Sequence, residues 1–152
     1  MQLFRILTPL VASALLATAA PLVQAQNSKG DDTLLEMQQA FRKGDRNKLA
    51  QLLPAARGHA LEPWAAYWEL RVRLGEASPQ EIQSFMQRYA GTYQEDRLRN
   101  DWLLLLGQRR DWSQFAEQHP SYRMSDDREV RCYALLIDQI KGTAPATVAE
   151  DV

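Results

Sequence analysis

The chain contains one cysteine, Cys132, and two histidines, His59 and His119, in 152 residues. A single cysteine cannot form a disulfide within the chain, so the protein is not a disulfide-stapled mini-protein. Cys132 lies in an apolar stretch over residues 131–137, where we expect a small buried hydrophobe, and neither histidine is placed to activate its thiol. Two histidines far apart in sequence also indicate neither a metal site nor a catalytic triad. We predict no cofactor and no metal.

Motifs that carry chemistry are missing as well. The sequence has no GxSxG, HExxH or CxxC motif and no glycine-rich phosphate loop. Glycoside cleavage requires a carboxyl group with a raised pKa, often with a second carboxylate about 5–10 Å away. Only Glu62 and Glu69 suggest such a pair, since seven residues on a helix span about 10 Å. Exposed helix glutamates of this kind are common, and we predict no catalytic residue.

An excess of positive charge is also absent. Lys and Arg together number 18 against 19 Asp and Glu, and the formal net charge is −1. A nucleic-acid binder carries a clustered basic excess, so nucleic acid is not an expected partner. The basic pairs at residues 42–43 and 109–110 stand next to Asp45 and Asp111, which is typical of solvated helix ends.

The N-terminus has the organisation of a secretory signal peptide. One positive charge in residues 1–5 precedes an apolar stretch over residues 6–20, and Val23-Gln24-Ala25 forms a small-residue cleavage pattern. We predict a signal peptide over residues 1–25, cleaved between Ala25 and Gln26, and a periplasmic protein. A membrane anchor is the alternative, but the apolar run is shorter than the ~20 residues that a spanning helix needs. No stable membrane anchor is therefore expected.

The mature chain, residues 26–152, shows helix signals and no strand alternation. The Asp-rich start at Asp31 and Asp32 predicts a helix that ends at Gly44. Capping boxes begin at Ser78 and Thr92. Further helices are expected from Asp45 to Pro54, from Pro63 to Gly75, from Ser78 to Gly91, from Thr92 to Gly107, from Asp111 to Pro120, and from Ser125 or Asp126 to Gly142.

Four glycines that we expect to stop helices recur with a regular spacing. Gly44, Gly75, Gly107 and Gly142 are separated by 31, 32 and 35 residues, which is the period of a helix pair. The predicted fold is all-α, with antiparallel helix pairs stacked as an α-superhelix or solenoid, a degenerate TPR-like array, preceded by the signal-peptide helix. An orthogonal helical bundle remains the alternative, because the repeats are degenerate.

Aromatic and aliphatic side chains at helical spacing are expected to pack between the pairs. Two apolar stripes on the helix at residues 63–75, and two more on the last helix, indicate burial on two sides. Trp64, Tyr67 and Trp68, here called the Trp64 cluster, have a second interpretation, a stacking platform for a sugar. The predicted packing residues are Trp64, Tyr67, Trp68, Leu98, Trp102, Leu106, Trp112, Phe115, Tyr133 and Ile137.

Three stretches resemble the soluble lytic murein transglycosylases. LEPWAAYWEL at residues 61–70 is similar to a "PL-x-PY-x-x-Y" segment of that family. MQQAFRKGD at residues 37–45, followed by LLP at residues 52–54, resembles its opening helix pair, and DWLLLLGQRRDW at residues 101–112 resembles its "W-L-x-x-L-G-x-R-x-D-W" repeat. The resemblance covers about residues 32–140, and its motifs are packing motifs.

The resemblance implies a superhelical U-shaped domain in a periplasmic enzyme that cleaves the MurNAc–GlcNAc bond of peptidoglycan and leaves a 1,6-anhydro end. The family's catalytic motifs have no counterpart here, so no active-site residue is carried over. We expect residues 26–152 to be a truncated N-terminal part of such a domain, inactive alone, with a catalytic domain in cis and glycan strands as partners. The alternatives are a stand-alone helical-repeat module for an envelope protein and a carbohydrate-binding module that uses Trp64 or Trp112.

Overall fold

The computed structural model describes residues 20–142, with side chains from residue 29 onward. This part of the chain is all-helical and contains no strand, which confirms the predicted all-α class. None of its helices is both long and apolar enough to cross a bilayer. The elements are α1 (Ala20–Lys43), α2 (Arg46–Ala56), α3 (Glu62–Val72), α4 (Pro79–Arg88), α5 (Tyr93–Gln108), α6 (Trp112–Gln118), the 3-10 helix η1 (His119–Ser121) and α7 (Arg128–Ile140).

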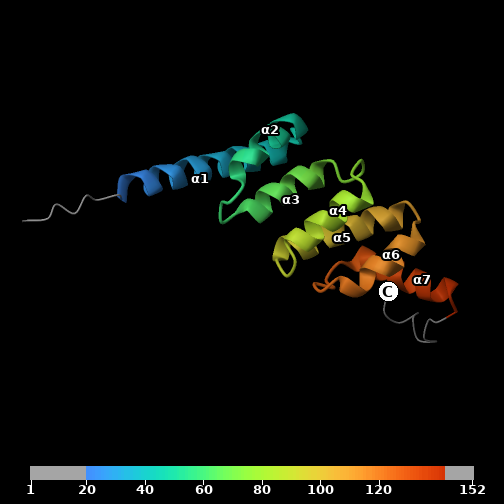
Figure 1. Ribbon diagram of the computed structural model, residues 1–152. Helices are drawn as coiled ribbons and strands as arrows, with labels where there is room; N and C mark the ends of the chain where they lie inside the picture. The colour runs from blue at the N-terminus through green and yellow to red at the C-terminus, as the bar shows by residue number, and fades with distance from the viewer. Residues whose placement is uncertain (1–19, 143–152) are drawn as a thin grey trace, which may run out of the picture.

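The odd-numbered helices contact one another in chain order. Helix α1 packs on α3, α3 on α5, and α5 on α7 (Figure 1). The even-numbered helices pack on these: α2 lies on both α1 and α3, α4 on α5, and α6 on both α5 and α7. The arrangement is elongated, with α1 and α7 at opposite ends of the helical part (Figure 1).

Side-chain caps begin most of these helices where the sequence predicts them. Asp45 and Asp111 each accept a hydrogen bond from the backbone N–H three residues on. Ser78 forms the complete capping box with Glu81. Thr92 accepts from Glu95 N at 3.2 Å, but the Glu95 side chain is paired with Arg99 instead of returning to the cap. The last helix is capped by Asp127, one residue later than the expected range.

Two apolar clusters make up the core. A smaller cluster joins α1, α2 and the near side of α3, where Met37, Leu49 and Ala65 are fully buried. The larger cluster extends from α3 to α7 and contains Tyr67 and Leu70 from the other side of α3. Helix α3 is therefore buried on two sides, as predicted, but Ala65, which faces the smaller cluster, belongs to neither of the two predicted apolar stripes.

Helix α5 carries an unusual set of buried polar residues that fix the loop between η1 and α7. Asp96 is 2% exposed and accepts hydrogen bonds from the backbone N–H groups of Arg123 and Met124 at 3.0 and 2.7 Å. Glu95 pairs with Arg99 at 2.5 Å and with Arg123 at 2.8 Å. Asp96 thus supplies acceptors to two backbone N–H groups of a loop that lies outside any helix.

Two predicted boundaries are wrong. Helix α1 begins at Ala20, so Asp31 and Asp32 lie inside it and cap nothing; Asp31 instead pairs with His59 Nε2 at 2.9 Å. Helix α2 continues through Pro54 to Ala56, because Pro54 falls in the last turn and Ala56 is fully buried. The predicted cleavage pair Ala25–Gln26 lies in the part of α1 whose side chains are not described. Residues 1–19 of the predicted signal peptide lie outside the described residues.

Two of the four expected stop glycines do not stop helices. Helix α3 ends at Val72, before Gly75, and Gly75 has no positive φ. Gly107 lies within α5, where its α carbon faces the ring of Tyr133, and the left-handed residue after α5 is Arg110, with φ 59°. Gly44 and Gly142 do adopt the left-handed conformation, with φ of 67° and 69°.

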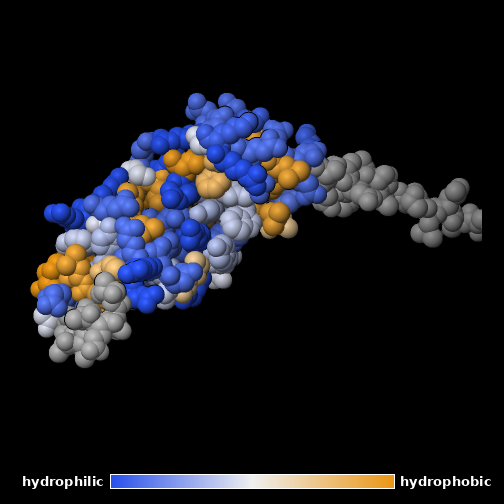
Figure 2. Space-filling model, turned by 180° about the vertical axis from the view of Figure 1, so that it is seen from behind, coloured by the Kyte–Doolittle hydropathy of each residue, from blue (hydrophilic) through white to orange (hydrophobic). Residues whose placement is uncertain are grey.

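The second apolar stripe of the last helix is exposed, contrary to expectation. Of this predicted stripe, Cys132, Leu136 and Gln139, all three are exposed, and Leu136 is 44% exposed. Ile140, the last residue of the helix, is 63% exposed. Figure 2 shows apolar side chains gathered at this end of the molecule. Among the described elements α7 packs mainly on α5 and α6, which cover only the Val130 and Ile137 side.

Candidate functional site

The predicted packing residues fall into two groups by burial. Trp102 is 3% exposed and sits in the larger core cluster. The structure brings Trp64, Tyr67 and Trp68 together beside Phe41, and a separate group forms at the other end of the helices around Phe115 and Tyr133. Fully buried are Tyr67, Leu98, Trp102, Leu106, Phe115 and Ile137, and half-buried are Trp64, Trp68, Trp112 and Tyr133.

Four half-buried or exposed rings from three helices form a continuous row, here called the aromatic ladder: Phe41, Trp68, Trp64 and Tyr93. Ring centroids are 6.1 Å apart between Phe41 and Trp68, 5.9 Å between Trp68 and Trp64, and 5.7 Å between Trp64 and Tyr93. The first two pairs are inclined by only 26° and 31°. Tyr93, at the end of the row, is 55% exposed.

A groove of about 390 Å³ runs along the ladder between α1 and α3. Phe41, Trp64 and Trp68 line it together with Leu61, which is 49% exposed. The polar lining consists of one amide and one cation, Gln38 and Arg42. The groove thus combines aromatic surface with few polar groups, which is typical of small-molecule sites.

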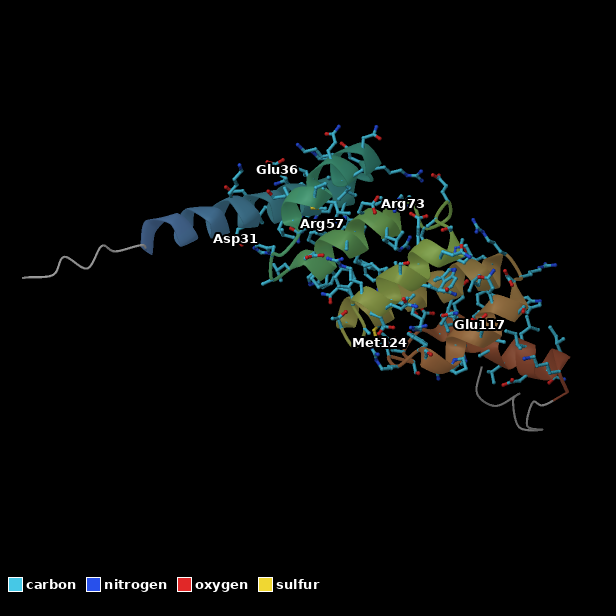
Figure 3. All side chains as sticks on the ribbon, viewed as in Figure 1. Asp31, Glu36, Arg57, Arg73, Glu117 and Met124 are labelled. Carbon is cyan, nitrogen blue, oxygen red and sulfur yellow. The ribbon has the colours of Figure 1, made fainter. Side chains whose placement is uncertain are left out.

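A second groove, of about 380 Å³, opens between α2, α3 and α4, and its lining contains three arginines and three glutamates beside apolar residues. Figure 3 labels two of these arginines, Arg57 and Arg73. Glu62 accepts hydrogen bonds from Gly58 N at 2.7 Å, Arg88 at 2.7 Å and Tyr89 Oη at 2.8 Å. Arg57, also in this groove, has no side-chain partner among the described residues.

Glu62 and Glu69, the two carboxylates considered above as a catalytic pair, are each held by an arginine. Burial raises the pKa of Glu62, but the hydrogen bonds from Gly58, Tyr89 and Arg88 outweigh it, and the pKa lies below the usual carboxyl value. A general acid needs the opposite shift. Glu69 is held by Arg73 through contacts of 2.7 and 3.2 Å. Both carboxylates are committed to ion pairs.

A buried hydrogen bond joins α3 to α5 behind the aromatic ladder. The Tyr67 hydroxyl donates to Asp101 at 2.7 Å, and Arg71 pairs with the same carboxylate oxygen at 2.9 Å. Burial, followed by the charge of Asp101, raises the pKa of Tyr67 to about 12. The phenol therefore stays protonated and can donate to Asp101 over the whole physiological pH range.

The glutamates of the second groove make stability fall in acid. Hydrogen bonds from Ser78 and Arg73 lower the pKa of Glu81. The pKa of Glu62 is lowered in the same way by the hydrogen bonds that this carboxylate accepts. A lowered folded-state pKa stabilises the protein above the ordinary value, 4.5, and that contribution is lost as pH falls through the folded-state pKa.

We expect the melting temperature to drop on the order of 5 °C more between pH 6 and pH 3.5 in the wild type than in Glu62→Gln. Glu117→Gln, an exposed site on α6 (Figure 3), is the matched control and should keep the wild-type pH dependence. Calorimetry at several pH values measures it. Equal acid sensitivity of wild type and Glu62→Gln would contradict the assignment.

Sequence reasoning missed Phe41, Tyr93 and Arg42 as members of one site, because they come from different helices or carry no motif. Among the residues that the structure describes, no three or more His, Cys, Asp or Glu side chains are grouped so that they could hold a metal ion.

No family model, curated protein or solved structure matches this chain.

Proposed function

We propose that this chain is a non-catalytic helical scaffold segment of a periplasmic soluble lytic transglycosylase, which holds peptidoglycan glycan strands for a catalytic domain in cis. In this proposal the helices form antiparallel pairs stacked as a superhelix, part of a U-shaped domain. The observation that carries it is the serial contact of α1, α3, α5 and α7, with α2 packed on both α1 and α3, α4 on α5, and α6 on both α5 and α7. Stacked helix pairs produce this order of contacts.

The local roles of the resembling segments add support. In the 37–45 segment Gly44 makes the left-handed turn and Asp45 caps α2. In the 101–112 segment Trp102 is buried, Gly107 admits Tyr133 and Asp111 caps α6. These residues of the two segments thus serve helix turns or helix packing, which suits a scaffold. The carboxylates Glu62 and Glu69 are neutralised by arginines.

The test uses the purified chain and isolated sacculi. We expect the chain to co-sediment with sacculi and to release no 1,6-anhydro muropeptides, while an active lytic transglycosylase added in parallel does release them. Chromatography of the soluble products with mass detection measures turnover. Anhydro products formed by the chain alone, or a chain that stays in the supernatant, would refute the proposal.

A further inference from the structure

We propose that the groove along the aromatic ladder binds a glycan strand that carries a carboxylate. The proposal rests on the scaffold function proposed above and assigns its glycan contact to one place. The groove is lined by Gln38, Phe41, Arg42, Leu61, Trp64 and Trp68, and Tyr93 extends the row of rings beyond it.

The ladder differs from the core rings in its exposure. Trp102 is 3% exposed and is enclosed by the larger core cluster. Trp64 and Trp68 pack against that cluster only in part, so each keeps accessible ring surface along the groove. Leu61, 49% exposed, closes one side and keeps the groove apolar. Packing alone therefore leaves this aromatic surface uncovered by the described residues.

Ring geometry suits a pyranose. Aromatic faces carry partial negative charge and attract the polarised C–H groups on the flat face of a sugar ring. The ring plane of Trp68 is inclined by 26° to that of Phe41 and by 31° to that of Trp64. The three successive rings therefore offer similarly inclined surfaces to a ligand. A row of this kind contacts several successive sugars of a linear strand.

The polar lining selects the ligand's charge. Arg42 and Gln38 make no side-chain hydrogen bond or ion pair with any described residue, so their donors are available. No Asp or Glu is among the residues that line the groove. A guanidinium without a partner, beside sugar-stacking rings, matches the carboxylate of an acidic sugar or of a peptide attached to the strand. One cation is too few for a polyanion such as nucleic acid.

Binding is measured with the full chain by tryptophan fluorescence and by calorimetry. The two probes are a neutral N-acetylglucosamine tetramer and a disaccharide of N-acetylglucosamine and N-acetylmuramic acid, which bears a lactyl carboxylate. We expect both to bind and the acidic sugar to bind more tightly. Substitution Arg42→Ala should weaken the acidic sugar about tenfold and leave the neutral sugar within about twofold. Lys43→Ala, the exposed neighbour outside the groove, is the matched control.

Trp64→Ala should weaken both sugars about tenfold or more, whereas Trp112→Ala, a half-buried tryptophan on α6 outside the ladder, should leave them unchanged. Circular dichroism verifies that each variant is folded; if Trp64→Ala unfolds, Tyr93→Ala, at an exposed ring, replaces it. The proposal is overturned if neither sugar binds at millimolar concentration, if Arg42→Ala affects both sugars equally, or if an apolar peptide binds the groove in their place. If these variants bind sacculi as well as the wild type does, the glycan does not bind in this groove, but the proposed scaffold function is not contradicted.

Discussion

Replacing Trp102 by alanine should destabilise the protein by about 3–5 kcal/mol, the range for truncating a buried aromatic side chain to alanine. Trp102 is 3% exposed in α5, the helix that contacts α3, α4, α6 and α7. Removing the indole opens a cavity at the junction of these helices. Because domains are stable by only about 5–15 kcal/mol, the loss is a large fraction of the total.

Urea denaturation followed by circular dichroism measures the effect as a fall in midpoint at constant slope. Trp102→Phe keeps most of the buried volume and should cost much less. Trp112→Ala is the comparison on the surface, since that ring is half-buried on α6. Loss of stability equal in Trp102→Ala and Trp112→Ala would show that α5 is not the centre of the core.

Most of the fold was predictable because helix formation is signalled locally. Asp45, Ser78 and Asp111 cap the helices that follow them, and each signal lies within a few residues of its effect. The buried stripes on α3 follow from helical spacing alone. The predicted start of α1 was wrong, since Asp31 sits inside the helix and its side chain pairs with His59, 28 residues further on, a contact that no local signal predicts.

Cys132 illustrates a limit of periodic patterns. An apolar stripe shows which side of a helix is suited to burial, but not whether another element covers it. In α7 the stripe at Cys132 and Leu136 has the same period as the one at Val130 and Ile137, yet only the second faces α5 and α6. Burial on both sides was inferred from the two stripes, and the described elements cover one.

The candidate sites depend on tertiary contacts more than the helices do, so less of them could be predicted from the sequence. Glu62 looked like a free surface glutamate because Arg88 and Tyr89, which hold it, lie 26 and 27 residues away. The aromatic ladder joins Phe41 to Trp64 and Tyr93 across three helices. The Trp64 cluster was visible in the sequence, with packing and sugar stacking as its two interpretations. In the structure Trp64 and Trp68 pack against the core on one side and line a groove on the other.

Replacing Gly107 by alanine should destabilise the protein by about 1–3 kcal/mol, the usual cost of overpacking. The sign is the informative part, because glycine-to-alanine in a helix interior ordinarily stabilises by about 0.5–1 kcal/mol. A β carbon at position 107 would lie 2.7 Å from Cγ of Tyr133 and still closer to the ring edge, so α5 and α7 would have to separate. Gly75→Ala, whose β carbon would meet only Arg109 Nη2 at 3.5 Å, is the matched control and should be nearly neutral.

A double-mutant cycle isolates the clash. Truncating Tyr133 to alanine removes the ring that occupies the space, so Gly107→Ala should cost at least about 1 kcal/mol less in the Tyr133→Ala background than in the wild type. Urea denaturation of the four proteins supplies the coupling energy. If Gly107→Ala stabilises the wild type, or if the coupling is zero, α7 does not pack on α5 through this glycine. A positive coupling would instead explain why a glycine stands inside a helix that ends at Gln108, with the left-handed conformation taken by Arg110.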